Sequence, residues 1–369
     1  MTGIAPRARR SLLRAALPAA LLAAAALAAF VYFGGTLPFG LAWHRRAKPD
    51  SATVALLQRQ KPFWDAVVTA ERVVAWWTAA DFGPQVREGC PGYLFLNDEF
   101  VVRRTHEVAF AQHLKIVGQV ADLLARRRIP LVIAVVPDKS RVEAKDLCGL
   151  RRPRELQDRL GRIVARLRGL DAKVIDLLPP LQAVDGDPYY RTDTHWNERG
   201  AQAAAEAVAV DLRGWGLASA QRAVFRVKHL PPRERIGDLI RVAGLDRVPW
   251  PLRPPGDIEA PTVIEQSASP GVGLLEETPV PDIVLLGTSF SQNGNFAPFL
   301  ALALGAPIDD RAEAGGGLIA AARAYFADPL FAKSPPKAIV WEIPERIMQE
   351  KRVPDVDRRW GDELARLPP

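Results

Sequence analysis

The fold of this chain is constrained most by an alternation of short, fully apolar runs with longer segments of helical periodicity. Runs of strand length occur at four places, LVIAVV (131–136), KVIDLL (173–178), DIVLL (282–286) and AIVW (338–341). Strands without polar alternation are typical of a parallel sheet covered on both faces. Amphipathic segments at 105–128, 153–170 and 199–215 separate these runs. The pattern therefore predicts an α/β fold with a doubly wound parallel sheet and helices on both faces.

The folded part is expected to begin near Ser51. Helical spacing over 52–80 predicts a further helix, with inward positions at Leu56, Phe63, Val67, Val74 and Trp77. The stretch from about Leu230 to Pro281 is rich in Pro and Gly, which predicts an irregular insertion over the sheet edge or the functional site. We expect one domain over 51–355, followed by a tail over 356–369.

The N-terminal segment has the charge pattern of a membrane anchor. Residues 1–14 carry four arginines and no acid, and Ala15 to Phe33 is free of charge. About nineteen apolar residues approach the length that a helix needs to cross a bilayer. We therefore predict a cytoplasmic basic tail (1–14), a transmembrane anchor (15–34) and a linker (35–50), with the remaining chain exported. A cleaved signal peptide is the alternative, because Ala26-Leu27-Ala28 has a small-x-small form.

Charge and cysteine content limit the partners further. The formal net charge is +7 and the pI is near 9.6. The basic excess is Arg scattered along helices and beside the N-terminal apolar segment, which makes nucleic acid the least favoured partner. The chain has two cysteines, Cys90 and Cys148. They predict one disulfide in an oxidising compartment, with two buried free thiols as the alternative. Two cysteines with no histidine nearby do not predict a metal site.

Polar residues that follow the predicted strands are the candidates for chemistry, because ligands gather at the carboxyl ends of such strands. Ser289 follows DIVLL, and Gly287 before it permits a sharp turn. The stretch YYRTDTHWNERGA places Asp193 two residues before His195. A serine needs a base to take its proton, and an acid that orients the base completes a Ser-His-Asp triad.

Each of these residues also has a simpler structural interpretation. Ser289 could cap a helix that starts near Phe296, and Asp193 could cap a helix that begins near Glu198. His195 could be a core histidine beside Trp196. The last strand is followed by Glu342, Glu345 and Arg346, which would either orient substrate or form a structural ion pair.

Several motifs together resemble a known family. YYRTDTHWNERGA, GTSFSQNGNF, AEAGGGL and IVWEIPER, with GDL at 237–239, are similar to the SGNH-hydrolase-like domain of the AlgJ/AlgX-like alginate O-acetyltransferases, over roughly 89–346. The Asp-His block precedes the serine block here, the reverse of ordinary SGNH esterases. AlgX-like members carry a carbohydrate-binding module after the last motif, and this chain ends at Pro369, so an AlgJ-like membrane-anchored architecture is expected.

The resemblance implies an SGNH-hydrolase-like fold and acetyl transfer in two steps. Ser289 would accept the acetyl group, His195 would be the base and Asp193 would orient it, with no cofactor and no metal. An oxyanion hole would come from backbone N–H groups at Ser289 or Phe290 and around Gly315 and Gly316, where Gly leaves room. The candidates for this hole and for substrate binding are Thr288, Phe290, Gly315, Gly316 and Arg346.

These observations lead to three hypotheses. The first is a periplasmic O-acetyltransferase, anchored by a single span in the bacterial inner membrane, that acetylates an exported polysaccharide such as alginate. Its acetyl donor would be a membrane-bound O-acyltransferase, as the resemblance implies. The second is a carbohydrate acetylesterase with the same triad, and the third is a non-catalytic subunit of an acetylation complex. The sequence leaves open which sugar hydroxyl is acetylated.

Overall fold

A computed structural model describes residues 51–267, 280–350 and 353–364. The predicted basic tail, anchor and linker, residues 1–50, lie outside these ranges. Within the ranges described, none of the helices is both long and apolar enough to span a bilayer.

The core of the protein is a five-stranded, wholly parallel sheet with the order β10-β9-β11-β3-β4. The strands are β3 (Leu131–Val136), β4 (Lys173–Asp176), β9 (Ile283–Leu286), β10 (Asp309–Asp310) and β11 (Ala338–Pro344). All the residues of β3, β9 and β11 are buried. The four predicted strands are therefore confirmed, and β10 is an additional short edge strand.

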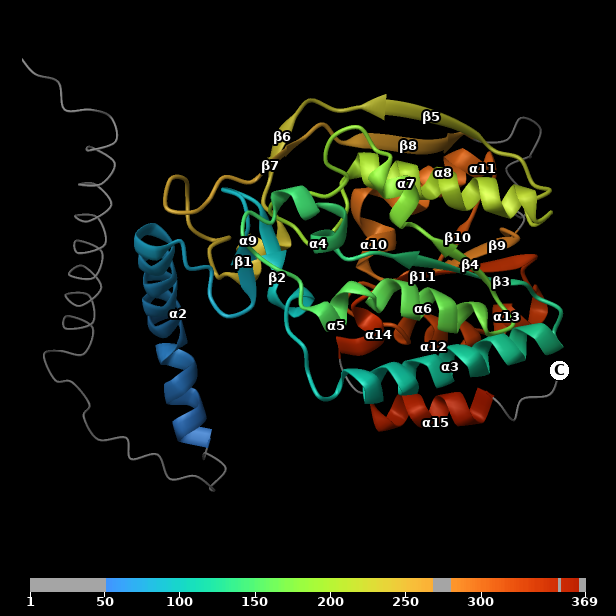
Figure 1. Cartoon of the computed structure of the whole chain (residues 1–369), viewed down its shortest axis with the longest axis horizontal. Coiled ribbons are helices and arrows are strands. Elements are labelled where there is room, and N and C mark those ends of the chain that lie inside the picture. Colours follow the sequence, from blue (N-terminus) through green and yellow to red (C-terminus); the bar gives the residue numbers. More distant parts are fainter. Residues whose placement is uncertain (1–50, 268–279, 351–352, 365–369) are drawn as a thin grey trace, which may run out of the picture.

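Helices cover both faces of the sheet, as Figure 1 shows. Alternate residues of β3 pack into the two layers, with Ile133 and Val135 in one cluster and Val132 and Ala134 in the other. The first layer contains α3 (His106–Arg126), α6 (Arg159–Arg168), α12 (Ala320–Ala327), α13 (Pro329–Lys333), α14 (Ile347–Glu350) and α15 (Asp355–Leu364). The second contains α7 (Leu178–Gln182), α8 (Glu198–Gly214) and α11 (Phe296–Leu304). The doubly wound α/β fold is confirmed.

Two predicted boundaries differ from the structure. The helix expected over 153–170 is divided into α5 (Arg154–Gln157) and α6, because Asp158 between them has a ψ of 3°. The domain also continues past 355, since α15 packs on α3 with Leu364 buried and Asp362 bound to Lys115 at 2.8 Å. Residues 356–364 are thus part of the domain rather than a tail.

Helix α2 (Ser51–Ala79) lies at one side of the molecule (Figure 1). Among residues 64–79 of this helix, whose side chains are described, Val73 is buried, whereas the predicted inward positions Val67, Val74 and Trp77 are only half-buried. Val73 packs with a small cluster from α9 (Asp238–Val242), β1 (Val86–Glu88) and β2 (Leu94–Leu96). The predicted inward side chains of Leu56 and Phe63 lie outside those described.

The predicted irregular insertion is more regular than expected. It contains β6 (Arg233–Arg235), which pairs antiparallel with β7 (Asp257–Glu259), and α9 lies between these two strands. It also contains β8 (Thr262–Ser267), which pairs antiparallel with β5 (Val224–His229), a strand that ends just before the predicted insertion. Most side chains of β5 are exposed, which hides the usual alternation of a half-buried strand. In Figure 1 the β5–β8 pair runs above α8 and α11, and β6, β7 and α9 lie toward the carboxyl ends of the sheet.

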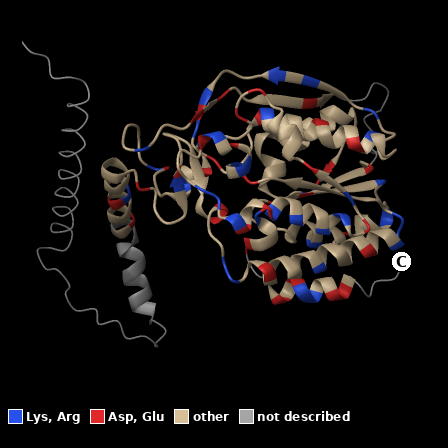
Figure 2. Ribbon diagram, in the orientation of Figure 1, with Lys and Arg blue, Asp and Glu red and all other residues tan. Residues whose placement is uncertain are grey.

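Cys90 and Cys148 form a disulfide, so the alternative of two free thiols does not hold. The bond ties the β1–β2 turn to the segment after the 3-10 turn η2 (Ala144–Asp146). Lys and Arg are interspersed with Asp and Glu along α3 and α15, as Figure 2 shows. Helix α6 carries four arginines and no acid. The positive net charge lies mostly outside the described chain, because residues 1–50 carry seven Lys and Arg against one Asp.

Candidate active site

Ser289 is the first residue of α10 (Ser289–Gln292), at the carboxyl end of β9. Thr288 caps this helix, because its Oγ1 accepts the Phe290 N–H at 3.2 Å. A Cβ at position 287 would lie 2.2 Å from Ser291 Oγ, so only glycine fits there. This turn places the Ser289 side chain at the carboxyl end of the sheet.

Glu342 holds the turn in place through hydrogen bonds. Its Oε2 accepts hydrogen bonds from Thr288 N at 2.7 Å, Thr288 Oγ1 at 3.0 Å and Ser291 Oγ at 3.1 Å. The carboxyl group is fully buried, and burial raises its pKa above the ordinary value against the opposing effect of these hydrogen bonds. Glu342 and Thr288, both considered for substrate contact from the sequence, thus bind each other beneath Ser289.

Ser289, His195 and Asp193 form one hydrogen-bonded chain. His195 Nε2 lies 2.8 Å from Ser289 Oγ, and His195 Nδ1 lies 2.6 Å from Asp193 Oδ1. Asp193 and His195 come from the loop between α7 and α8, whereas Ser289 follows β9. The structure therefore brings together the three residues that the sequence placed at strand ends.

The simpler interpretations of Asp193 and Ser289 are wrong. Asn197 caps α8, because its Oδ1 accepts N–H groups from Arg199 at 3.0 Å and Gly200 at 3.2 Å. The residue at the N-cap of α11 is Asn295, not Ser289. Neither Asp193 nor Ser289 therefore caps these helices.

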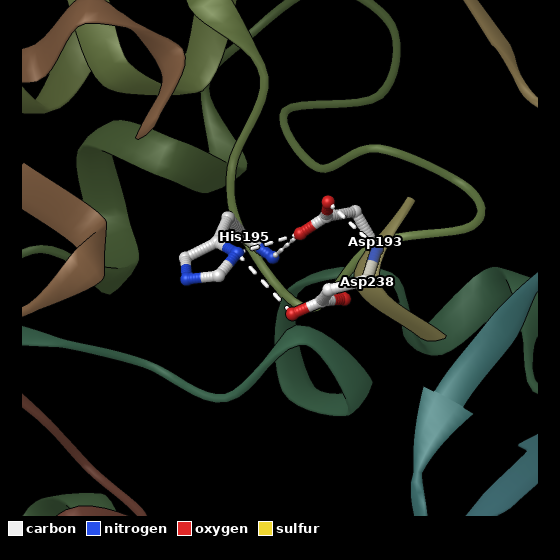
Figure 3. Close-up of side chains that lie close together, drawn as sticks. All are labelled: Asp193, His195 and Asp238. Carbon is white, nitrogen blue, oxygen red and sulfur yellow. Dashed lines mark hydrogen bonds and ion pairs between the residues drawn. The ribbon is translucent and has the colours of Figure 1, made fainter. Parts of the chain in front are cut away.

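Four donors surround the Asp193 carboxylate. His195 Nδ1 and the His195 N–H bind Oδ1 at 2.6 and 3.0 Å, while Arg235 Nη2 and the Asp238 N–H bind Oδ2 at 2.9 and 3.0 Å. Burial alone would raise the pKa of Asp193, but the hydrogen bond from His195 and the charges of His195 and Arg235 lower it well below its ordinary value. Asp193 is therefore ionised and held in one orientation against the imidazole (Figure 3).

Asp238, at the start of α9, is a second acid beside the imidazole (Figure 3). It lies 3.5 Å from His195 Nδ1 and accepts hydrogen bonds from Thr194 N at 2.7 Å and Thr194 Oγ1 at 2.5 Å. Burial and the neighbouring Asp193 raise its pKa above the ordinary value. Sequence reasoning missed its place at the site, although GDL at 237–239 contributed to the family resemblance.

Arg235 was also missed, since it lies in the insertion with no motif of its own. Its guanidinium stacks over the Tyr190 ring at 4.6 Å and donates to Asn293 Oδ1 at 3.2 Å. Asn293 Nδ2 in turn donates to the Ser289 backbone carbonyl at 2.8 Å. Arg235 thus links the Asp193 carboxylate to the segment that carries Ser289.

Lys139 fixes the loop before His195 from the interior. Its Nζ donates to the carbonyl oxygens of Leu94 at 2.6 Å, Arg191 at 2.8 Å and Asp193 at 3.0 Å. Burial lowers the pKa of Lys139 to about 8. The position of Asp193 is therefore set by backbone contacts as well as by its side-chain partners.

The ligand atoms of Asp193, His195 and Asp238 lie within 4.8 Å of one another, a spacing that could suit a metal ion. However, His195 Nδ1 is engaged by Asp193, and the Arg235 guanidinium binds the same carboxylate. A guanidinium at this position repels a divalent cation. The arrangement is therefore suited to orienting an imidazole, and we assign no metal to it.

Ser289 opens onto a cleft of about 380 Å³ that also contains Gly315 and Gly316. The Ser289 and Gly315 N–H groups have no acceptor among the described residues, so they are free to bind an oxyanion. By contrast, the Phe290 N–H donates to Thr288, and the Gly316 N–H donates to the Glu313 carbonyl at 3.3 Å. Of the amides considered from the sequence, those of Ser289 and Gly315 fit the role best.

The Phe290 side chain packs against the base instead. Its ring lies 4.7 Å from the His195 ring, centroid to centroid, and the Arg346 guanidinium lies 5.2 Å from the Phe290 ring centroid. Arg346 therefore reaches the site through a cation–π contact. Glu345 belongs to a buried ion-pair network with Arg141 at 2.7 Å and Arg159 at 3.1 Å, which makes it the structural ion pair.

The chain is similar to known acetyltransferases in sequence and in fold. Residues 86–345 match the family described as the SGNH hydrolase-like domain, acetyltransferase AlgX. The probable alginate O-acetylase AlgJ of Azotobacter vinelandii is 34% identical over 289 residues, covering 74% of this chain and 73% of that protein. The Pseudomonas aeruginosa protein of that name is 32% identical over 291 residues, covering 74% of each.

Solved structures show the same relationship. The O-acetyltransferase domain of Pseudomonas putida AlgJ superposes with a TM-score of 0.67 at 26% identity, covering 77% of this chain and 99% of that domain. Pseudomonas aeruginosa AlgX shares the fold, with a TM-score of 0.57 at 23% identity. The chain therefore belongs to the AlgX-type family of SGNH hydrolase-like acetyltransferases.

Proposed function

We propose that this protein is an O-acetyltransferase that moves an acetyl group through an acetyl-Ser289 intermediate onto hydroxyl groups of an exported polysaccharide. The observation that carries the proposal is the hydrogen-bonded chain from Asp193 through His195 to Ser289. Its geometry is the one that nucleophilic catalysis by a serine requires.

In the first half-reaction, Ser289 Oγ attacks the carbonyl carbon of the acetyl donor, and its proton passes to His195 Nε2. Asp193 keeps the proton on His195 Nδ1 and stabilises the imidazolium that forms. The Ser289 and Gly315 N–H groups stabilise the oxyanion. When the carbonyl bond re-forms, the leaving group departs with the proton from His195, and acetyl-Ser289 remains.

In the second half-reaction, a sugar hydroxyl gives its proton to His195 Nε2 and attacks the acetyl-serine carbonyl. The ester bond to Ser289 Oγ then breaks, and Ser289 takes the proton back from His195. Water in place of the sugar would give an acetylesterase, so the two functions differ only in the second acceptor.

The acceptor that we propose is alginate or a similar exopolysaccharide. Support comes from the names of the relatives, which are probable alginate O-acetylases identical to this chain at 34% and 32% of positions. We place the catalytic domain in the periplasm, held to the inner membrane by residues 15–34. The Cys90–Cys148 disulfide favours an oxidising compartment of this kind.

We further propose that the acetyl group reaches Ser289 from a membrane-bound O-acyltransferase, since acetyl-CoA is a cytoplasmic donor. N-terminal sequencing of the mature protein tests the anchor. An intact N-terminus in the membrane fraction is expected, whereas a mature chain starting near Ala29 would show a cleaved signal peptide.

The decisive experiment supplies the purified protein with 4-nitrophenyl acetate as donor and a mannuronate oligosaccharide as acceptor. We expect an acetylated oligosaccharide, together with an acetyl group on the peptide that contains Ser289 when acceptor is withheld. Ser289→Ala should abolish both, and Ser334→Ala, a change remote from the sheet edge, serves as the matched control. Acetate release to water with no acetylated sugar would identify an esterase, and activity surviving in Ser289→Ala would exclude the proposed mechanism.

A further inference from the structure

The cleft in front of Ser289 contains a second histidine that the proposed mechanism does not use. His113 comes from the middle of α3 and lines this cleft together with Ser289 and the loop from Gly315 to Gly317. A volume of about 380 Å³ falls within the range of small-molecule sites. The cleft is thus large enough to hold a ligand next to the nucleophile.

The hydrogen bonding of His113 defines its tautomer. Its Nδ1 lies 3.2 Å from the Met348 backbone carbonyl, which can only accept a hydrogen bond, so Nδ1 carries the proton. Burial is the main cause that lowers the pKa of His113 below its ordinary value, which keeps the ring neutral. Hydrogen bonding to the Met348 and Ala109 backbone raises the pKa of His113 against the effect of burial. Nε2 is then an acceptor to which no described group donates.

The charged side chains that line the described part of the cleft are acceptors as well. They are the carboxylates of Glu350 and Asp357, of which Asp357 also pairs with Arg323 at 2.6 Å. An acceptor-rich wall pairs with hydroxyl donors and repels a ligand carboxylate. The polar chemistry of the cleft therefore selects the hydroxyl-bearing edge of a sugar.

The remaining walls of the cleft are apolar side chains and bare backbone. Apolar side chains of the cleft are Leu318, Ile319, Ile347 and Pro354. Gly315 and Gly317 have φ values of +77° and +66°, and a Cβ at either position would meet nothing within 4 Å. Bare backbone and apolar side chains thus leave open space beside Ser289.

We propose that this cleft binds the sugar unit that receives the acetyl group, and that His113 Nε2 accepts a hydrogen bond from one of its hydroxyls. The inference rests on the proposed function, because it assigns the acceptor side of that reaction. His113 is a binding residue for the acceptor and takes no part in forming acetyl-Ser289.

The test uses the full-length protein and two rates, acetate release from 4-nitrophenyl acetate and acetyl transfer to a mannuronate oligosaccharide. In His113→Asn the amide nitrogen can replace Nδ1 toward Met348, while the acceptor at Nε2 is lost. We expect the ratio of transfer to ester hydrolysis to fall by about fivefold to tenfold, as for one lost hydrogen bond. His113→Gln, whose amide oxygen reaches toward the Nε2 position, should recover part of the ratio.

His106→Asn is the matched control, since His106 is a buried histidine on the same helix that does not line the cleft. Its ratio should equal that of the wild type. An unchanged ratio in His113→Asn, whether both rates fall together or neither falls, would overturn the inference. Ser289→Ala distinguishes failure of the proposed function from failure of the acceptor site. Residual acetyl transfer in Ser289→Ala would refute the proposed function itself. An inactive Ser289→Ala together with a normal ratio in His113→Asn would refute only the acceptor site.

Discussion

At the scale of single residues, the site combines three side chains that the sequence predicted with residues of the insertion that it did not predict. Asp193, His195 and Ser289 could be found because each follows an apolar run. Arg235 and Asp238 could not be found in this way, because a polar residue in an exposed, Pro-rich insertion has no periodicity that marks it. Only the folded chain shows that both bind Asp193.

The orienting role of Asp193 gives a first prediction. Asp193→Asn removes the negative charge that faces His195 Nδ1 at 2.6 Å, so the other imidazole tautomer becomes available and the imidazolium loses its counter-charge. We expect kcat for acetyl transfer to fall by roughly 10³–10⁴-fold, as in other Ser-His-Asp enzymes. Transfer kinetics with a circular dichroism spectrum as the folding control measure this, and a loss below tenfold would contradict the assigned role.

A second prediction concerns Arg235 as a positioning residue. The charge of Arg235, 2.9 Å from Asp193 Oδ2, contributes to the lowered pKa of this carboxyl, together with the larger contribution of His195. In Arg235→Met the pKa of Asp193 should rise, so activity should begin to fall at a higher pH on acidification than in the wild type. Asp238 also faces Asp193, and its negative charge acts on the pKa of Asp193 in the same direction as the loss of Arg235.

We expect kcat of Arg235→Met at pH 7 to fall by about tenfold, the size of one lost charge-assisted hydrogen bond, with the KM for acceptor little changed. Arg235→Lys keeps the charge and should restore the acid limb of the profile. A pH profile that does not move in Arg235→Met, or one that Lys fails to restore, would assign Arg235 a merely structural role.

At the scale of elements, sequence patterns were reliable wherever burial dictates the residue type. Strands β3, β9 and β11 are buried on both faces, so their apolar runs could mark them directly. Strand β5 faces solvent over most of its length and gave no such signal. The break between α5 and α6 was likewise invisible, because the apolar positions keep helical spacing across Asp158.

The disulfide between two of these elements gives a third prediction. It closes a loop of 58 residues between the β1–β2 turn and the segment after η2, and the adjoining Cys90 N–H donates to the Asp146 carbonyl at 2.7 Å. Replacing both Cys90 and Cys148 by Ala should lower the free energy of unfolding by about 2–4 kcal/mol, since the unfolded chain loses its cross-link. Urea unfolding of the double variant and of the reduced wild type should give the same midpoint, and a midpoint equal to that of the oxidised wild type would count against this contribution.

At the scale of the whole molecule, buried ionisable groups determine how stability depends on pH. Arg159 and Arg152 hold the pKa of Asp138 at about 2 against the effect of burial, so the stability that Asp138 contributes is lost as pH falls from about 4 toward 2. Burial raises the pKa of Glu143 to about 7, so the folded chain must ionise a buried carboxyl group as pH rises through 7. The unfolded chain ionises the same group near its ordinary value, so Glu143 favours folding at low pH and opposes it above pH 7.

A fourth prediction isolates this effect. Glu143 Oε1 accepts the Tyr189 N–H at 3.1 Å, a bond that the amide oxygen of Glu143→Gln can retain, while the charge is removed. The variant should be more stable than the wild type at pH 8.5 by on the order of 1–3 kcal/mol. Most of this gain should be lost at pH 4.5, where the wild-type carboxyl is protonated in the folded state and only partly ionised in the unfolded state. Urea unfolding at the two pH values measures the difference. Glu155→Gln, an exposed change on α5, is the control and should show no such pH-dependent gain. An equal gain for Glu143→Gln at both pH values would mean that packing, rather than ionisation of Glu143, determines its contribution to stability.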